Sequence, residues 1–411
     1  MTKAESFTKS KNRGPFSIPE FQRFFAGQSL SYLGDGLRTL AIPLIVYHLT
    51  GSATSIGITL GLQTLPYGIM AIIGGSLSDR VDRKTIMMAC DFSRFVIMAM
   101  LCLAYYTHSL GIALLYLGVF LLSVAGAIFN GCQTPSIPFL VGRKNTKSAI
   151  SIMQTTEQTV GLIAPPLGGT ILGLMGPLPA LMLDACTYLG SQISLASVKT
   201  FGPNKPTGFP KMSEIKSDVI LGWNALKNDS ALKIFTLSST ILGSTYLLIA
   251  VNIVPLLKKE YGATDQSVGF AYGVMAIGAV LGSFFAGRTR TPFGKTTLYL
   301  NYVDALPWVV IALVHNFWIT VACITVSNMA NSFKFVNTIA WRLRIIPAER
   351  FGRVFGVMRS ITVPGMFFGG LIGGMMDDHL GPQKAIGIGI TIYLAWSTRM
   401  WFFRDLRLED R

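Results

Sequence analysis

Gly75-Ser76-Leu77-Ser78-Asp79-Arg80-Val81-Asp82-Arg83-Lys84 is a dense cluster of charge between two long apolar stretches. The apolar sequence before it reaches back to about Ser55, and apolar sequence resumes with Ile86-Met87-Met88-Ala89. In a soluble protein this pattern would be a surface turn between two core helices. The flanking runs are about 20 residues long, which at 1.5 Å per residue is enough to cross a hydrocarbon core roughly 30 Å thick. The stretch therefore predicts a polar loop between two membrane-spanning helices.

The composition of the whole chain agrees with a membrane protein. Of its 411 residues, 51% are hydrophobic and only 13% are charged, whereas a soluble domain carries about 25% charged residues. The mean hydropathy is +0.50. We therefore predict an all-α membrane protein with twelve transmembrane helices, rather than two or three soluble domains. The expected spans are 22–48, 55–78, 86–107, 111–137, 148–174, 180–198, 233–256, 267–287, 296–315, 317–340, 353–375 and 384–403.

The net charge of +15 raises the possibility of nucleic-acid binding, but its distribution argues against it. The loops on the side opposite the termini hold only Lys258, Lys259 and Lys384, and most of the other basic residues lie on the side of the termini. This is the asymmetry of the positive-inside rule, so we expect both termini in the cytoplasm and a lipid bilayer, not a nucleic acid, as partner.

The chain divides into two similar halves. A 34-residue polar segment at 199–232 separates a bundle at 22–198 from a bundle at 233–403, with cytoplasmic tails at 1–21 and 404–411. Its second part places Ile215, Val219, Trp223 and Leu226 at helical spacing, which predicts an amphipathic helix at the membrane interface. The span that ends at Arg80 matches the span that ends at Arg288, and Arg143 matches Arg353. Such a repeat predicts two pseudo-symmetric six-helix bundles and transport by alternating access.

The motifs resemble those of a known family. Gly75-x-Leu77-x-Asp79-Arg80-x-x-Arg83-Lys84 resembles the loop signature of the major facilitator superfamily, and Asp82 in place of the usual second glycine is similar to the macrolide-efflux and enterobactin-exporter branch. Further resemblances to that branch lie in Leu33-Gly34-Asp35-Gly36, in Asp91-x-x-Arg94 and in the segment 347–354. The resemblance implies a secondary transporter with the major facilitator fold.

The charged loop has two interpretations. Asp79 ends a span, where a carboxylate favours the positive N-terminus of a neighbouring helix, and Gly75 permits close helix approach. Arg80, Arg83 and Lys84 are expected to meet the anionic cytoplasmic leaflet. The resemblance implies that Asp79 joins a charge relay, with Arg94 as partner, that closes the cytoplasmic side; the alternative is a topology anchor. The second half has no acid that matches Asp79 near Arg288, so such a gate would be asymmetric.

A second motif lies in the fifth expected span. Gly161-Leu162-Ile163-Ala164-Pro165-Pro166-Leu167-Gly168-Gly169 resembles the antiporter signature, with Ala164 where glycine is usual. The resemblance implies export. The small residues also permit tight packing, and the prolines kink the helix without any transport role.

Charges inside the membrane are the candidates for energy coupling. Asp35 lies roughly 16 Å into the first span, where burying an acid costs on the order of 3 kcal/mol. Arg38 is three residues on and shares its helical face. Either the two form a static pair, or Asp35 carries a proton across the membrane while Arg38 tunes it. Glu157 and Asp304 are further candidates.

Other charged groups have simpler expectations. Lys334 and Arg359 are expected to extend toward the interface, and Asp184 to lie near the outer end of its span, within reach of water. The four histidines fall at outer ends. The five cysteines show no paired spacing, so we expect no disulfide framework, metal or cofactor.

These observations favour a non-enzymatic, monomeric, multi-pass transporter of the bacterial inner membrane. It would export small amphiphilic molecules such as drugs or antibiotics by proton antiport. Siderophore export is the alternative within the same family branch, and a non-transporting sensor or scaffold is a third possibility.

Overall fold

The computed structural model describes residues 14–78, 82–199, 201, 212–288, 293–346 and 348–403, and these residues form helices without strands. The first half contains a short 3₁₀ turn, η1 (Pro15–Ser17), and five helices: α1 (Pro19–Thr50), α2 (Ala53–Ser78), α3 (Arg83–Tyr106), α4 (Ile112–Met175) and α5 (Pro177–Ser197). The second half contains α7 (Ser230–Ala250), α8 (Ile253–Pro255), the π-helical turn η2 (Leu256–Glu260), α9 (Asp265–Arg288), α10 (Phe293–Leu313), α11 (Phe317–Ile345), α12 (Ala348–Leu380) and α13 (Pro382–Met400).

Helix α4 contains two of the predicted spans. The helix is interrupted only at Gly142, whose φ of 74° and ψ of 160° are not helical. A positive φ of this kind is readily adopted by glycine. The expected spans 111–137 and 148–174 leave residues 138–147 as a loop, with Gly142-Arg143-Lys144-Asn145-Thr146-Lys147 returning the chain to the cytoplasm. That prediction is wrong, because the helix is interrupted at one glycine and the next helix begins at once. With α4 counted as two spans and α7 continuing through α8 and η2, the described helices provide twelve spans.

The sequence accounts for several helix ends. Asp82 caps α3 by accepting hydrogen bonds from the amides of Lys84 and Thr85, which is a structural use for the residue that replaces the usual glycine of the motif. Asn316 caps α11 in the same way. Gly51 ends α1 with a φ of 62°. Polar side chains at helix starts and glycine at a helix end allow long apolar helices to follow one another with few intervening residues.

Six helices are apolar and long enough to cross a membrane by length and composition alone, among the described residues. They span Arg83–Tyr106, Ile112–Gly142, Ser230–Glu260, Asp265–Ala286, Gly294–Leu313 and Arg353–Leu380. Others carry polar groups in the interior of the protein: α1, for example, contains buried Gln28 and Ser31 in addition to Asp35 and Arg38.

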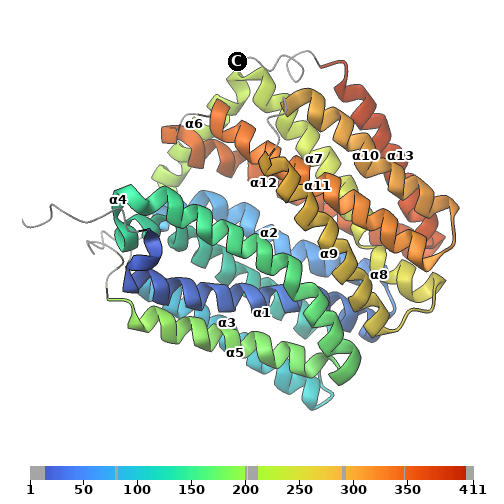
Figure 1. Ribbon diagram of the computed structural model, residues 1–411, viewed down its shortest axis with the longest axis horizontal. Helices are drawn as coiled ribbons and strands as arrows, with labels where there is room; N and C mark the ends of the chain where they lie inside the picture. The colour runs from blue at the N-terminus through green and yellow to red at the C-terminus, as the bar shows by residue number, and fades with distance from the viewer. Residues whose placement is uncertain are drawn as a thin grey trace, which may run out of the picture.

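The two halves pack as separate groups of helices that meet along α2 and α12 and along α4 and α9. In Figure 1 the blue and green helices α1–α5 form one group and the yellow to red helices α7–α13 form the other. A Cβ added at Gly57 of α2 would collide with the carbonyl oxygen of Gly370, and one at Gly374 of α12 would collide with that of Ala53. Glycines therefore bring these two backbones into direct contact.

The two ends of the molecule differ in charge. We call the end that carries the starts of α1 and α7 the basic end, and the end that carries Gly51, Gly176 and Gly381 the far end. Helix α6 (Met212–Asn228) lies at the basic end, where Gly222 packs against the backbone of Arg353. Leu226 is buried, whereas Trp223 is 50% exposed. The boundaries of the two bundles and of the segment between them remain sequence predictions.

Candidate functional site

Four side chains from α1 and α5 form a charge cluster inside the first bundle. Arg38 Nη2 lies 2.6 Å from Asp35 Oδ1, and Arg38 Nε lies 3.2 Å from Asp184 Oδ2. The hydroxyl of Tyr188 donates a hydrogen bond of 2.8 Å to Asp35 Oδ1. The side chain of Asp35 is 36% exposed and that of Asp184 is 0% exposed. Arg38 is thus shared between an accessible acid and a buried one.

This arrangement has a chemical consequence. With both acids ionised, the trio of Asp35, Arg38 and Asp184 carries a formal charge of −1. A proton on Asp35 makes the trio neutral while Arg38 keeps Asp184 as its ionic partner. The predicted Asp35–Arg38 pair is present, and its role in coupling remains a prediction. The expectation for Asp184 is wrong: it is fully buried against Arg38 rather than exposed to water near a membrane surface.

A second pair supports the cluster from α3. Arg94 Nη2 lies 2.8 Å from Asp91 Oδ1, and both side chains are buried. The Arg94 guanidinium also stacks 4.6 Å from the centre of the Phe129 ring and 4.9 Å from that of Tyr188. Tyr188 therefore contacts both charged groups. Asp79 and Arg80 lie outside the described residues, so the predicted relay between Asp79 and Arg94 stays a prediction.

The described basic residues of the loop donate hydrogen bonds to backbone carbonyls of the protein. Arg83 donates to the carbonyl of Pro135 at 3.0 Å, and Lys84 donates to those of Ala196 and Val198 at 3.0 and 2.6 Å. Ala196 and Val198 stand at the C-terminus of α5, where carbonyl groups are free and the helix dipole favours a cation. Lys84 thus caps the C-terminus of α5, whereas Arg83 binds a carbonyl inside α4. The expectation that these cations meet the cytoplasmic leaflet stays a prediction.

Glu157 lies on the second part of α4 with an exposed side chain. It interacts electrostatically with Asp35 and with Arg359 of α12. Arg359 is half-buried, so it faces charges of the other half rather than only extending toward the interface. These three residues join the two halves electrostatically near the accessible side of Asp35. The coupling role of Glu157 remains a prediction.

The antiporter-like motif packs on α1 in part. A Cβ added at Gly36 would collide with that of Ala164, and one at Gly168 would lie 3.1 Å from the carbonyl oxygen of Leu37. Ala164 and Gly168 therefore seat α4 directly beside the residues that carry Asp35 and Arg38. Gly161 has open space around it, with no atom within 4 Å of an added Cβ. The packing of Pro165 and Gly169 lies outside what the structure describes.

The second bundle contains its own polar cluster. Lys334 Nζ lies 2.5 Å from Asp304 Oδ2 and 2.6 Å from the hydroxyl of Tyr393. Ser327 donates to the other oxygen of Asp304 at 2.5 Å. Asn301 is within 3.4 Å of Lys334. Lys334 is thus an interior partner of Asp304, and the expectation that it extends toward the interface is wrong.

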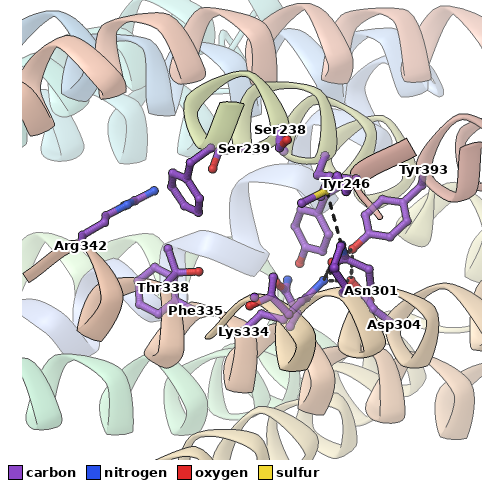
Figure 2. Close-up of a pocket in the computed structure, with 18 of the residues that line it drawn as sticks. Ser238, Ser239, Tyr246, Asn301, Asp304, Lys334, Phe335, Thr338, Arg342 and Tyr393 are labelled. Carbon is purple, nitrogen blue, oxygen red and sulfur yellow. Dashed lines mark hydrogen bonds and ion pairs between the residues drawn. The ribbon is translucent and has the colours of Figure 1, made fainter. Parts of the chain in front are cut away.

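This cluster closes one end of a cavity of about 330 Å³ between α7, α10, α11, α12 and α13. Figure 2 shows Lys334, Asp304, Asn301 and Tyr393 together at one end, and Arg342 at the opposite end. A cavity of this size lies within the range of small-molecule pockets. Asp304 was a candidate from sequence; the cavity itself was not, because its walls come from five helices.

Polar contacts join the halves at the far end. Asp378 of α12 accepts hydrogen bonds from the amides of Ala53 and Thr54 at 2.9 and 3.1 Å and from the hydroxyl of Ser52 at 2.6 Å. It therefore caps the first turn of α2 from the other half. His48 of α1 lies 3.0 Å from Asp265 of α9, which also pairs with Lys258. Sequence analysis missed Asp378 and Asp265, because each lies far along the chain from its partner in the first half, Ser52 or His48.

No group of three or more His, Cys, Asp or Glu side chains suited to a metal ion occurs among the described residues. The comparisons with known proteins are consistent with the geometry of a transporter. The model of the Major Facilitator Superfamily matches residues 24–303 and 243–411. The chain belongs to the major facilitator superfamily.

Relatives of known function are distant but match along most of the chain. The enterobactin exporter EntS of Escherichia coli O1:K1 / APEC is 23% identical over 391 residues, which cover 91% of this chain and 90% of the exporter. The enterobactin exporter EntS of Escherichia coli O9:H4 (strain HS) is 23% identical over 392 residues, with the same coverage.

Solved transporter structures share the fold. A mutant of the nucleoside transporter NupG superposes with a TM-score of 0.71 at 13% identity, covering 93% of this chain and 99% of that protein. A bacterial homologue of the iron transporter ferroportin in an inward-facing state gives 0.69 at 15% identity, covering 92% and 99%. This superfamily member is therefore a multi-pass membrane transporter with the twelve-helix fold, and not an enzyme.

Proposed function

We propose that this transporter exports a small amphiphilic molecule in exchange for protons. The observation that carries the proposal is the sharing of Arg38 between the accessible Asp35 and the buried Asp184. Asp35 is thus an acid in the interior of a membrane protein. When Asp35 is protonated, Arg38 still has Asp184 as its ionic partner. Intramembrane acids of this kind commonly mark proton pathways.

The proton and the substrate would use Asp35 alternately. When the protein opens at the far end, Asp35 takes a proton from outside; when it opens at the basic end, Asp35 releases the proton and the site accepts substrate. The cap on α2 supplied by Asp378 and the His48–Asp265 pair support a structure closed at the far end. With the termini placed in the cytoplasm by the positive-inside rule, this is the inward-facing stage of export by a monomer in the bacterial inner membrane.

Two substrate groups remain candidates. Drug or antibiotic efflux fits the resemblance of the motifs to efflux proteins. Siderophore export is favoured by a separate observation, the match to enterobactin exporters over 91% of the chain. The proposed coupling residues would serve either substrate.

The proposal is tested in proteoliposomes that hold the purified protein, with a fluorescent amphiphile as substrate and a pH dye in the lumen. An imposed proton gradient is expected to drive substrate accumulation with proton counterflow, and Asp35→Asn is expected to abolish both. Glu20→Gln, at the start of the same helix, is the control and should transport normally. Accumulation that persists after collapse of the gradient, or normal concentrative transport by Asp35→Asn, would refute the proposal. Parallel assays with enterobactin and with rhodamine 123 separate siderophore export from drug efflux.

A further inference from the structure

The cavity in the second bundle has two different charged ends. Lys334, Phe335, Thr338 and Arg342 line it from one face of α11. Lys334 and Arg342 are eight residues apart, which is about 12 Å along a helix. Figure 2 shows Arg342 and the Lys334 cluster at opposite ends of the cavity. A molecule in this cavity would therefore meet a different group at each end.

Among the described residues, Lys334 is paired with a carboxylate and Arg342 is not. Lys334 has Asp304 at 2.5 Å. Arg342 has no carboxylate within 4 Å among the described side chains, and its Nε is buried without a hydrogen-bond acceptor. Instead its guanidinium lies 4.9 Å from the centre of the Phe235 ring and 5.4 Å from that of Phe355. Arg359 is a second cation that acts on Arg342.

The walls between the two ends combine unused polar atoms with apolar surface. Ser238 Oγ and Thr297 Oγ1 line the cavity and are buried without a partner among the described residues. Phe235, Phe335 and Met366 provide aromatic and thioether surface. Buried polar atoms are normally paired, and aromatic rings and methionine pack well against flat apolar ligands. The cavity thus offers hydrogen bonds, apolar contact and one positive charge, Arg342, that no described carboxylate compensates.

We propose that this cavity is a substrate subsite for amphiphilic aromatic anions. The acidic group of the ligand pairs with Arg342, its ring packs between Phe235 and Phe335, and a polar group at its other end reaches toward Lys334 and Tyr393. A cation of the same shape would place like charge beside Arg342 without a compensating acid. The inference rests on the proposed transport of amphiphiles and adds the sign of the charge that the protein selects.

Two dyes of one skeleton and opposite charge test the inference. Fluorescein is a xanthene anion and rhodamine 123 is a xanthene cation. Binding is measured by fluorescence polarisation to the purified full-length protein in nanodiscs of zwitterionic lipid, without any proton gradient. We expect fluorescein to bind at least tenfold more tightly than rhodamine 123. Arg342→Gln should weaken fluorescein binding at least tenfold, whereas Arg399→Gln, an equal loss of charge at an exposed site outside the cavity, should leave it unchanged.

A second variant tests the same charge without removing Arg342. Thr338→Glu places a carboxylate one turn from Arg342 on the same face, where it neutralises the guanidinium. It should weaken fluorescein binding and leave rhodamine 123 binding equal or stronger. Equal affinity for the two dyes in the natural protein, or fluorescein binding that neither variant weakens, would overturn the proposal.

Two further measurements distinguish a bound lipid from a substrate and binding from proton coupling. If an anionic lipid is the occupant, phosphatidylglycerol nanodiscs would abolish fluorescein binding and proteoliposomes would not transport the dye, and that result would overturn the assignment as a substrate subsite. The binding measurement uses no proton gradient, whereas proton coupling is measured only by concentrative transport in proteoliposomes. A failure of proton coupling would therefore appear in transport alone, and a failure of this inference would appear in binding.

Discussion

The shared arginine predicts a specific pattern of non-additive stability. Asp35→Asn leaves Arg38 paired with Asp184, and Asp184→Asn leaves it paired with Asp35 at 2.6 Å. Each single change also removes the repulsion between two acids that face one cation. We therefore expect each to cost only about 1 kcal/mol, the net value of a typical hydrogen bond.

The double variant is different because it removes both carboxylates. Arg38, whose side chain is only 13% exposed, would then be a buried cation without an ionic partner. Breaking a buried ion pair in this way costs about 3–5 kcal/mol. The loss should therefore exceed the sum of the two single losses by at least about 1 kcal/mol, as in other coupled networks. Replacing Arg38 with Met in the double variant should recover much of the loss.

The cysteines of the protein provide the assay. Cys90, Cys102 and Cys132 are buried, Cys323 is partly buried and Cys186 is exposed. A thiol-reactive fluorogenic dye therefore labels Cys186 at once and the buried thiols only as the protein unfolds on heating. The expected order of thermal midpoints is natural protein, then the two single variants, then the triple variant, with the double variant lowest. If the stability loss of the double variant does not exceed the sum of the losses of the two single variants, the reasoning about the shared Arg38 is refuted.

Two further predictions concern the second bundle and the far end. Asp304→Asn should lower the thermal midpoint because it leaves Lys334 buried without its ionic partner. Adding Lys334→Met should restore much of the midpoint. An equal loss in the single and the double variant would argue against a buried pair. Asp378→Ala should cost the start of α2 about 1 kcal/mol of capping and populate a state open at the far end. Spin labels at Leu49 and Leu380, both exposed there, should report longer distances, while Glu260→Gln should not change them; an unchanged distribution in Asp378→Ala would exclude this role.

The sequence was sufficient for the fold because its signals are local. Length and polarity of the apolar runs, together with the repeat of the halves, determine twelve spans and their grouping. The Asp35–Arg38 pair was also predictable, since a spacing of three residues defines a shared helical face. The reversal at Gly142 was not, because a polar segment is usually long enough to form a loop and only the backbone angles show that one residue suffices.

The contacts between distant helices could not be predicted. Asp184 pairs with Arg38 because α5 packs on α1 at a particular rotation, which hydropathy does not specify. Lys334 reaches Asp304 across two neighbouring helices for the same reason. A charge near the end of a span was interpreted by its depth alone, and depth does not identify the helix that it faces.

Asp378, which caps α2, influences how fast the transporter opens without contacting the residues proposed for substrate binding or proton coupling. Each time the far end opens, the first amides of α2 exchange a carboxylate for water, so the lifetime of the closed state depends on that exchange. Residue 378 contacts neither the acids near Arg38 nor the cavity near Arg342. Turnover could thus be adjusted at one position during evolution without altering what is carried or how its movement is driven.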